Sequence, residues 1–350
     1  MQPRIRSIVV AAALLASGLV PGLQANASTL SVTAARADIA LTASPRTPQP
    51  VNTSCPPGTT LVGGGGWTGR AADPTQVPET PYWMKSLLPV DASGHPVADG
   101  TTDPTTWQAD PQFGPMTETT DKGVVFAMCA TNGPTATIVR TASVNSAATA
   151  GNPPLKATAT CQPGEQLVGG GILLKPDNTT NYISKASYPS DAAGNPVTNN
   201  TFAPDSWTGY SSFGFTIGGE TTTVYAVCAT AGPPMSVQVA VTDAPSPSTA
   251  GTFTNTTATC PNHTTLLDGG WEYDETVNNV SGLEPNQGLH SRGSYPSDAS
   301  GNMVAGGTVD ATSWSVVTQP GGLTTLNTTV HAYALCARYG LREHGAPALG

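Results

Sequence analysis

The sequence predicts an all-β protein made of three homologous, disulfide-stapled units, each of about 100 residues. Two observations predict the units: a cysteine that leads into a glycine run occurs three times, and each copy is followed by a strand-like segment that ends in a second cysteine. A third observation excludes helices, because no segment has sustained helical spacing of apolar residues while Gly, Pro, Thr and Asn interrupt the chain. The cysteines fall into three successive pairs: Cys55 and Cys129, Cys161 and Cys228, and Cys260 and Cys336.

The first 27 residues have the features of a secretory signal peptide. Arg4 and Arg6 form a charged start, residues 8–20 are apolar, and Ala25-Asn-Ala27 is a small-residue cleavage site. No second apolar run approaches the length that crosses a bilayer. We therefore expect a secreted, extracellular protein without membrane insertion, with residues 28–30 as a frayed start of the mature chain.

Each unit is expected to begin with a leader strand that lies about two dozen residues before its first cysteine. The leaders start at Ser31, Ala136 and Ser236. The resulting units are 31–134, 135–234 and 235–350, the last including a C-terminal tail.

The unit joints suggest how the units are assembled. Short Gly/Pro segments, such as the one around Gly133-Pro134, separate a closing strand from the next leader, which is typical of a hairpin. Closing strands would then pair with the following leader, and the strand at 331–337 would pair with the leader at Ser31. This closes a pseudo-three-fold ring that resembles a β-prism. Three β-sandwich domains in a row are the alternative.

Two disulfide patterns respect the repeat. Pairing within units gives Cys55–Cys129, Cys161–Cys228 and Cys260–Cys336, whereas pairing across boundaries joins each unit to the next. The first is favoured because every unit then has its own staple, worth roughly 4 kcal/mol in the chain-entropy model.

The glycine runs and three tryptophans are interpreted as structural. No Gly-Lys-Ser/Thr follows the glycines, so they indicate close backbone packing or a bulge in a strand instead of a phosphate loop. Trp107, Trp207 and Trp314 keep a nearly constant distance from the closing cysteine, which favours core positions.

Composition limits the partners. The formal net charge is −9, charged residues are 11% of the chain, and basic residues form no cluster, which argues against nucleic acid. No cofactor-binding or metal-binding motif is present, so none is expected. The sequence does not indicate an oligomeric state.

The pattern Cys-Pro-x-Gly, Leu-Val-Gly-Gly-Gly, Trp and Tyr-Ala-x-Cys-Ala, which the three units match with some departures, resembles a repeat of secreted actinobacterial proteins of unassigned function. It also looks like terminal modules of collagen-like and phage tail proteins. More distantly, it resembles the vitelline membrane outer layer protein, which implies a β-prism of three sheets. These resemblances imply no catalytic residues.

Aromatic residues that do not recur at equivalent positions of all three units are the ligand-binding candidates. Trp83 aligns with Ile183 and His290, and Trp67 and Trp271 are also irregular. An exposed tryptophan can stack on a sugar ring, which makes Trp83, Trp67, Trp271 and His290 candidates for a polysaccharide or cell-envelope ligand. The alternative interpretation is that these side chains fill the local core.

Acidic residues of the third unit are the only catalytic candidates. Asp268 replaces a glycine of the other units, and Glu272, Asp274 and Glu275 follow it closely. Two carboxylates facing a cleft could serve a glycosidase, but acidic loops are usually solvated.

A basic residue also precedes an aspartate by six positions in each unit, as in Lys85 and Asp91. The expected interpretation is a salt bridge that ties a loop, and the alternative is one polar site in each unit. No H-E-x-x-H, G-x-S-x-G or free cysteine is present, so we do not expect an enzyme.

The leading hypothesis is therefore a secreted, non-catalytic binding or cell-surface protein that recognises glycan or cell-envelope polymer. The alternatives are a secreted hydrolase that uses the carboxylates of the third unit, and a purely structural extracellular protein.

Overall fold

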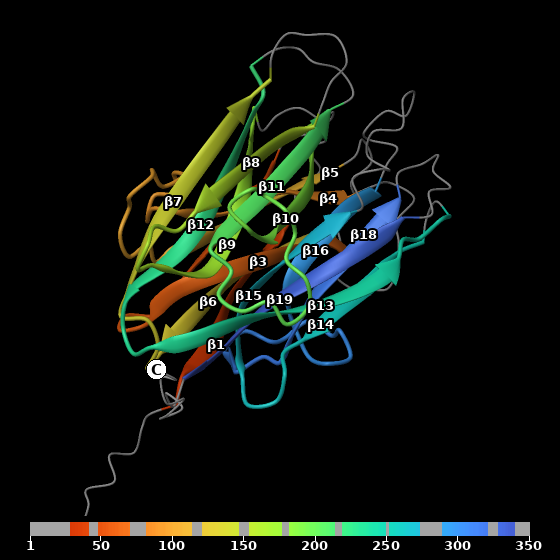
Figure 1. Cartoon of the computed structure of the whole chain (residues 1–350). Coiled ribbons are helices and arrows are strands. Elements are labelled where there is room, and N and C mark those ends of the chain that lie inside the picture. Colours follow the sequence, from red (N-terminus) through yellow and green to blue (C-terminus); the bar gives the residue numbers. More distant parts are fainter. Residues whose placement is uncertain are drawn as a thin grey trace, which may run out of the picture.

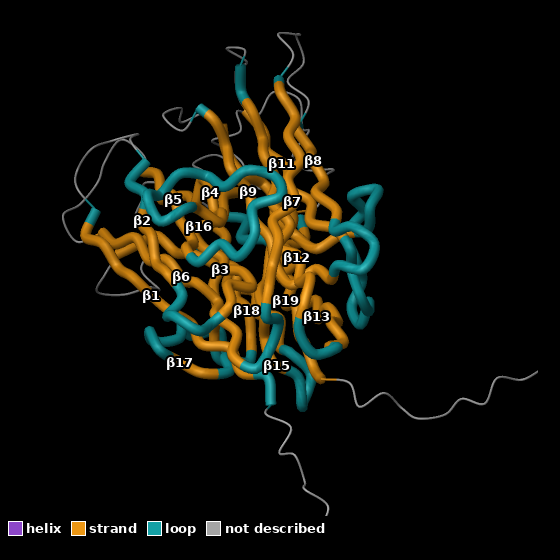
Figure 2. The backbone as a smooth tube through the Cα atoms, turned by 90° about the vertical axis from the view of Figure 1, so that its left-hand side faces the viewer, coloured by secondary structure: helices purple, strands orange, loops and turns teal. Residues whose placement is uncertain are grey.

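A computed structural model describes residues 29–41, 48–70, 82–113, 121–146, 154–176, 182–213, 219–249, 252–273, 289–320 and 328–339. Its regular structure in these ranges consists of strands (Figure 2). The signal peptide proposed for residues 1–27 lies outside them. Leu30 does not belong to a frayed terminus, because its side chain is buried in the core beside the first strand.

The strands of the first unit are β1 Ser31–Ala40, β2 Val51–Ser54, β3 Thr60–Arg70, β4 Tyr82–Val90, β5 Thr106–Phe113 and β6 Asp121–Thr131. Those of the second are β7 Ala136–Asn145, β8 Leu155–Thr160, β9 Gln166–Lys175, β10 Tyr182–Ser190, β11 Ser206–Phe213 and β12 Thr221–Ala231. Those of the third are β13 Met235–Pro245, β14 Thr254–Thr259, β15 Thr265–Tyr273, β16 Leu289–Ser297, β17 Thr308–Val309, β18 Ser313–Pro320 and β19 Thr329–Tyr339.

The strands form three sheets, and every sheet combines strands of two units (Figure 1). Sheet A has the order β14-β18-β16-β3-β6-β1-β17, sheet B has β2-β5-β4-β9-β12-β7, and sheet C has β13-β19-β15-β10-β11-β8. Their inner faces enclose one main hydrophobic core. The predicted three-unit all-β assembly is therefore confirmed. Three tandem sandwiches are excluded, because a sandwich would keep each unit's strands together.

The predicted hairpins across the unit joints are wrong. Each leader strand pairs with the closing strand of its own unit: β1 with β6, β7 with β12, and β13 with β19. At the first joint Asn132 has a positive φ of 56°, and β6 lies in sheet A while β7 lies in sheet B. The chain therefore turns a corner between sheets where a hairpin would have kept it in one sheet.

The ring closes through other contacts, which recur three times. The middle of each sheet joins two units: β16 meets β3, β4 meets β9, and β10 meets β15. In addition, a bridging loop of each unit reaches the leader strand of the next unit. Gly100 donates to Val139, Asn200 to Val239 and Gly307 to Ala34, each from backbone nitrogen to backbone oxygen at 2.8–2.9 Å.

The disulfides follow the predicted pairing within units: Cys55–Cys129, Cys161–Cys228 and Cys260–Cys336. Disulfides are typical of proteins that fold in an oxidising environment. Across the ranges given above, the structure contains no helix with the length and apolar character needed to span a bilayer.

Trp107, Trp207 and Trp314 are buried in the core, as predicted. The indole nitrogen of Trp207 donates to Ser187 Oγ at 2.8 Å, and that of Trp314 donates to Ser294 Oγ at 2.6 Å. In the first unit Leu87 occupies the corresponding position. The indole nitrogen of Trp107 accordingly has no hydrogen-bond partner among the described residues.

This difference predicts that Trp107→Phe destabilises the fold less than Trp207→Phe or Trp314→Phe. The first change removes an unsatisfied buried donor, whereas the other two remove a hydrogen bond, so the free energies of unfolding should differ by about 1 kcal/mol. Denaturant unfolding of the three variants measures this. Equal losses in all three would contradict the assignment of Leu87.

Candidate functional site

The predicted aromatic ligand residues are buried in the structure. Trp67, Trp83, Trp271 and His290 are each less than 5% exposed. Trp83 and His290 stack on one another with ring centroids 5.4 Å apart, and the indole nitrogen of Trp83 donates to Gln112 Oε1 at 2.8 Å. This contact joins the first unit to the third. The rings therefore serve packing between units, and the expectation that they form an exposed platform for sugar is corrected.

Asp268 lies where the three glycine runs converge. The position of Asp268 corresponds to Gly63 and Gly169 in the other units, and a Cβ added to either glycine would collide with the Asp268 side chain. Its carboxylate accepts hydrogen bonds from Gly64 N at 3.2 Å, from Gly170 N at 2.9 Å, and from Gly269 N. One carboxylate thus binds one backbone N–H from each unit.

The side chain of Asp268 is fully buried, and burial raises its pKa well above the ordinary value, against the opposing effect of the three N–H donors. The catalytic interpretation of Asp268 is therefore wrong. The carboxylate is buried at the pseudo-three-fold axis, where the three units meet. It does not line a cleft that a substrate could enter, as catalysis requires. Asp274 and Glu275 lie outside the described residues, so Glu272 is the remaining catalytic candidate only within the part of the chain that the structure describes.

The predicted pairs between a basic residue and an aspartate six positions later do not form. Lys85, Lys185 and Arg292 are buried, and each donates to a backbone oxygen of the next unit; Lys185 Nζ, for example, is 2.7 Å from Leu289 O. Burial lowers the pKa of Lys185 to about 7. The three basic side chains therefore form contacts between units.

The aspartates of these pairs lie in exposed turns. Asp91 Oδ1 accepts hydrogen bonds from Ser93 N at 2.8 Å and from His95 N at 2.9 Å, and the pKa of its carboxyl is lowered by these backbone donors. The same turn recurs at Asp191 and Asp298. Six residues of extended strand, about 20 Å, separate each aspartate from its basic residue.

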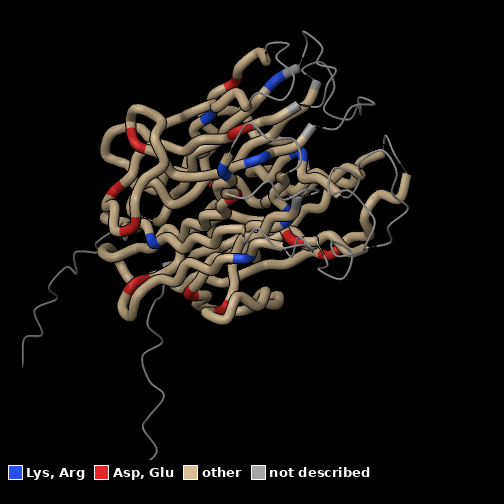
Figure 3. The backbone as a smooth tube through the Cα atoms, turned by 90° about the horizontal axis from the view of Figure 1, so that it is seen from above, with Lys and Arg blue, Asp and Glu red and all other residues tan. Residues whose placement is uncertain are grey.

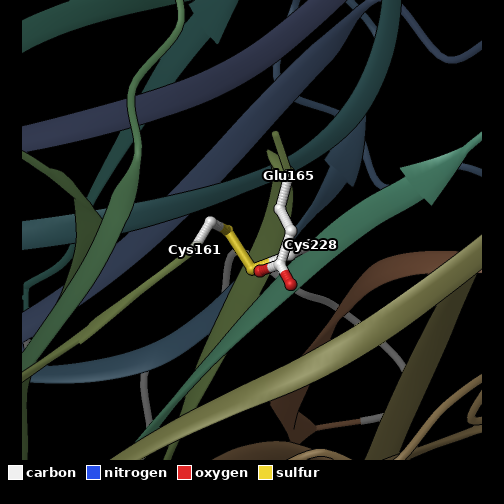
Figure 4. A group of neighbouring side chains, drawn as sticks. All are labelled: Cys161, Glu165 and Cys228. Atoms are coloured by element: carbon white, nitrogen blue, oxygen red, sulfur yellow. A yellow bond between two sulfur atoms is a disulfide. The ribbon is translucent and has the colours of Figure 1, made fainter. Parts of the chain in front are cut away.

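The side chains of Cys161, Glu165 and Cys228 lie close enough together to hold a metal ion, but the two cysteines are not in the form that binds one. Glu165 lies beside the Cys161–Cys228 disulfide (Figure 4). Thiolate is the form of cysteine that binds metal, and these two sulfurs are bonded to each other. The Glu165 carboxylate instead accepts hydrogen bonds from Arg140 and from Gln162 N. The group is therefore part of the unit's staple.

A groove of about 640 Å³ lies on the outer face of sheet C. The sheet C groove is lined by Lys156, residues 195–199, Val241, Asp243, Glu272, His331 and Tyr333. Its wall is the bridging loop of the second unit, which is fixed to β13 where Asn199 Oδ1 accepts from Val241 N at 3.1 Å. Figure 3 shows that charged residues are few and scattered over the described chain, so a groove with several ionisable side chains stands out.

Three of these side chains form a row across neighbouring strands. Glu272 of β15 is the cross-strand partner of His331 of β19, which in turn faces Asp243 of β13. His331 Nδ1 lies 2.7 Å from Asp243 Oδ1. Tyr333, two residues along the same face of β19, donates from its hydroxyl to Glu272 Oε2 at 2.8 Å. Burial and the neighbouring Glu272 charge raise the pKa of the Tyr333 hydroxyl.

The equivalent positions of the other two sheets are different. In sheet B, Leu173 replaces Glu272, and Tyr225, the equivalent of Tyr333, belongs to an apolar cluster. The pair His331 and Asp243 is replaced there by Thr223 and Ser143. In sheet A, Trp67, Val124 and Phe126 take the positions of Glu272, His331 and Tyr333. Asp38 takes the position of Asp243 there, but it pairs with Arg36, which lies over the Phe126 ring. The row of Glu272, His331 and Asp243 is therefore found in sheet C alone among the three described sheets.

Comparisons with known proteins assign no family. No protein-family model matches the chain, and no curated protein sequence matches it significantly. A function of the sheet C groove can therefore be inferred only from the residues that line it.

Of the groove residues, the sequence had indicated only Glu272. Asp243 and His331 are 88 residues apart and meet through the register of β13 and β19. Ser143 and Thr223 of the second unit meet in the same way, at 2.8 Å, but the register that joins the two strands is not visible in the sequence.

Proposed function

We propose that the protein is a secreted, non-catalytic binding protein that recognises a glycan or cell-envelope polymer through the sheet C groove. The observation that carries the proposal is the row Glu272–His331–Asp243, which replaces Leu173, Thr223 and Ser143 at the equivalent positions of sheet B. A residue that departs from a rigid repeated scaffold is free to serve a function of one unit.

The chemistry of the groove suits polyhydroxylated ligands. Carboxylate and amide oxygens, here Asp243, Glu272 and Asn195, accept hydrogen bonds from hydroxyl groups. The partly exposed ring of His331 supplies apolar surface beside these acceptors, while Tyr333 is buried, with its ring centroid 6.5 Å from that of His331. Secretion is part of the proposal and is supported by the leader-like first 27 residues together with the three disulfides.

Co-sedimentation of the mature protein with peptidoglycan, chitin and microcrystalline cellulose tests the proposal. We expect wild-type protein to sediment with at least one polymer and the variant Asp243→Ala/His331→Ala to lose about tenfold in affinity, because the variant lacks two groove side chains. The matched control is Ser143→Ala/Thr223→Ala, which changes the equivalent pair in sheet B and should bind like wild type.

Three outcomes would contradict the proposal. If the wild-type protein binds none of the polymers, the proposed binding function is wrong. If both variants lose the same affinity, the groove is not the binding site. Release of soluble sugar from a bound polymer, abolished by Glu272→Gln, would replace the binding protein by the hydrolase.

A further inference from the structure

We propose that the ligand of the sheet C groove is a linear polymer that lies lengthwise along β13 and β19, and that the groove recognises a stretch of chain in preference to a terminal sugar. This inference rests on the proposed function and specifies how the ligand lies.

The groove does not end at His331. A second hollow of about 450 Å³ is lined by Asp243, Ala244, Pro245, Thr328 and Thr329. Asp243 belongs to both hollows. The two hollows therefore adjoin at this residue.

The floor of the combined groove is a regular ladder. Three successive pairs face the same side of sheet C, because alternate residues of a strand point to one face: Val241 with Tyr333, Asp243 with His331, and Pro245 with Thr329. At about 3.4 Å per residue, the floor from residue 241 to residue 245 is about 14 Å long. This length exceeds a single sugar ring.

The exposed part of the ladder carries ring surface and polar groups side by side. His331 and Pro245 supply rings next to the buried Tyr333, and Asp243, paired with His331, is an acceptor that keeps 62% of its side chain exposed. Successive rungs are about 7 Å apart. A chain of linked sugars also presents ring faces and hydroxyl groups at regular intervals, so the groove matches a chain better than one compact ligand.

The far end of the groove lies at the edge of sheet C. β13 is the last strand at its side of the described sheet, and the second hollow lies at the end of β13 and the start of β19. A polymer that enters beside the bridging loop at Asn195 can therefore follow the described edge of the sheet as far as Thr329.

The test compares two matched variants on whichever of peptidoglycan, chitin or cellulose retains the wild-type protein. Thr329→Leu fills the far hollow without adding charge or a ring, and Thr221→Leu makes the same change at the equivalent position of sheet B. We expect Thr329→Leu to weaken binding about tenfold and Thr221→Leu to leave it unchanged, with similar melting temperatures for both.

Wild-type affinity in Thr329→Leu, combined with lost binding in Asp243→Ala/His331→Ala, would overturn the inference and leave the proposed function intact. Soluble fragments of the same polymer give a second measurement. Competition should strengthen with fragment length, and a single sugar that competes as well as a longer fragment would show that the groove holds one residue. Failure of the wild-type protein to bind any of the polymers would instead remove the proposed function itself.

Discussion

Replacing Asp268 by glycine will lower the free energy of unfolding by about 3 kcal/mol or more, because three buried N–H groups lose their acceptor at once and each unsatisfied group costs about 1–3 kcal/mol. The change restores the glycine that the other two units carry at this position. The repeat alone would therefore predict an unchanged or increased free energy of unfolding. Denaturant unfolding of the mature protein measures the difference.

For Asp268→Asn, the difference in free energy of unfolding from wild type should depend on pH. Because burial raises the folded-state pKa of Asp268 above its ordinary 3.8, the folded state binds the proton more tightly than the unfolded chain. The stability from this carboxyl is thus complete below pH 3.8 and is lost as the pH rises through the folded-state pKa. An asparagine does not titrate, so the disadvantage of the variant in free energy of unfolding should shrink as the pH rises above 3.8.

An unchanged stability in Asp268→Gly would contradict the assignment of Asp268 to the axis. Ser246→Ala is a suitable control, because Ser246 is also a buried polar residue of the third unit, and its hydroxyl accepts a hydrogen bond from Thr328 N at the rim of the fold instead of at the axis. It should cost about 1 kcal/mol.

Gly270→Ala is expected to be comparably damaging for a different reason. A Cβ at this position would meet the backbone oxygen of Ser187, which belongs to the neighbouring unit, and would lie 3.0 Å from Tyr188 Cα. Both atoms are main chain of β10 and cannot rotate away. We expect a loss of about 3 kcal/mol, at the upper end of the range for overpacked cores, measured by thermal or denaturant unfolding.

The three-fold repeat supplies an internal check on this prediction. Gly65 and Gly171 meet the backbone oxygens of Ser294 and Leu87 in the same way, so alanine at either position should be similarly costly. Gly306→Ala is the control, because its nearest neighbours are atoms of the Arg36 side chain, which is partly exposed and can shift. Tolerance of all three run positions would contradict the close approach of the units.

The parts of the fold that depend on local patterns could be predicted from the sequence. The leader strand expected from Ser31 is β1, and the pairing of Cys55 with Cys129 follows once each unit is recognised as a module. The glycine runs were correctly interpreted as close packing. These features repeat three times, so each copy supports the others.

The parts that depend on how the units meet could not be predicted. A Gly/Pro turn at 132–134 is compatible with a hairpin and with a corner between sheets, and only the packing of the other units selects the corner. Asp268 was visible as a departure from the repeat, but its place on the axis requires all three glycine runs to converge. The groove likewise depends on the register of β13 with β19, which the spacing of Asp243 and His331 does not reveal.

The central claim is that three interlocked units form one closed ring, in which every sheet is shared by two units. Differential scanning calorimetry of the mature, oxidised protein tests it most directly. The shared sheets predict a single transition whose calorimetric enthalpy equals its van't Hoff enthalpy, and the Asp268→Gly variant should shift that whole transition to lower temperature. Separate transitions, with only one of them shifted by the variant, would show that the units fold independently and would contradict the closed ring.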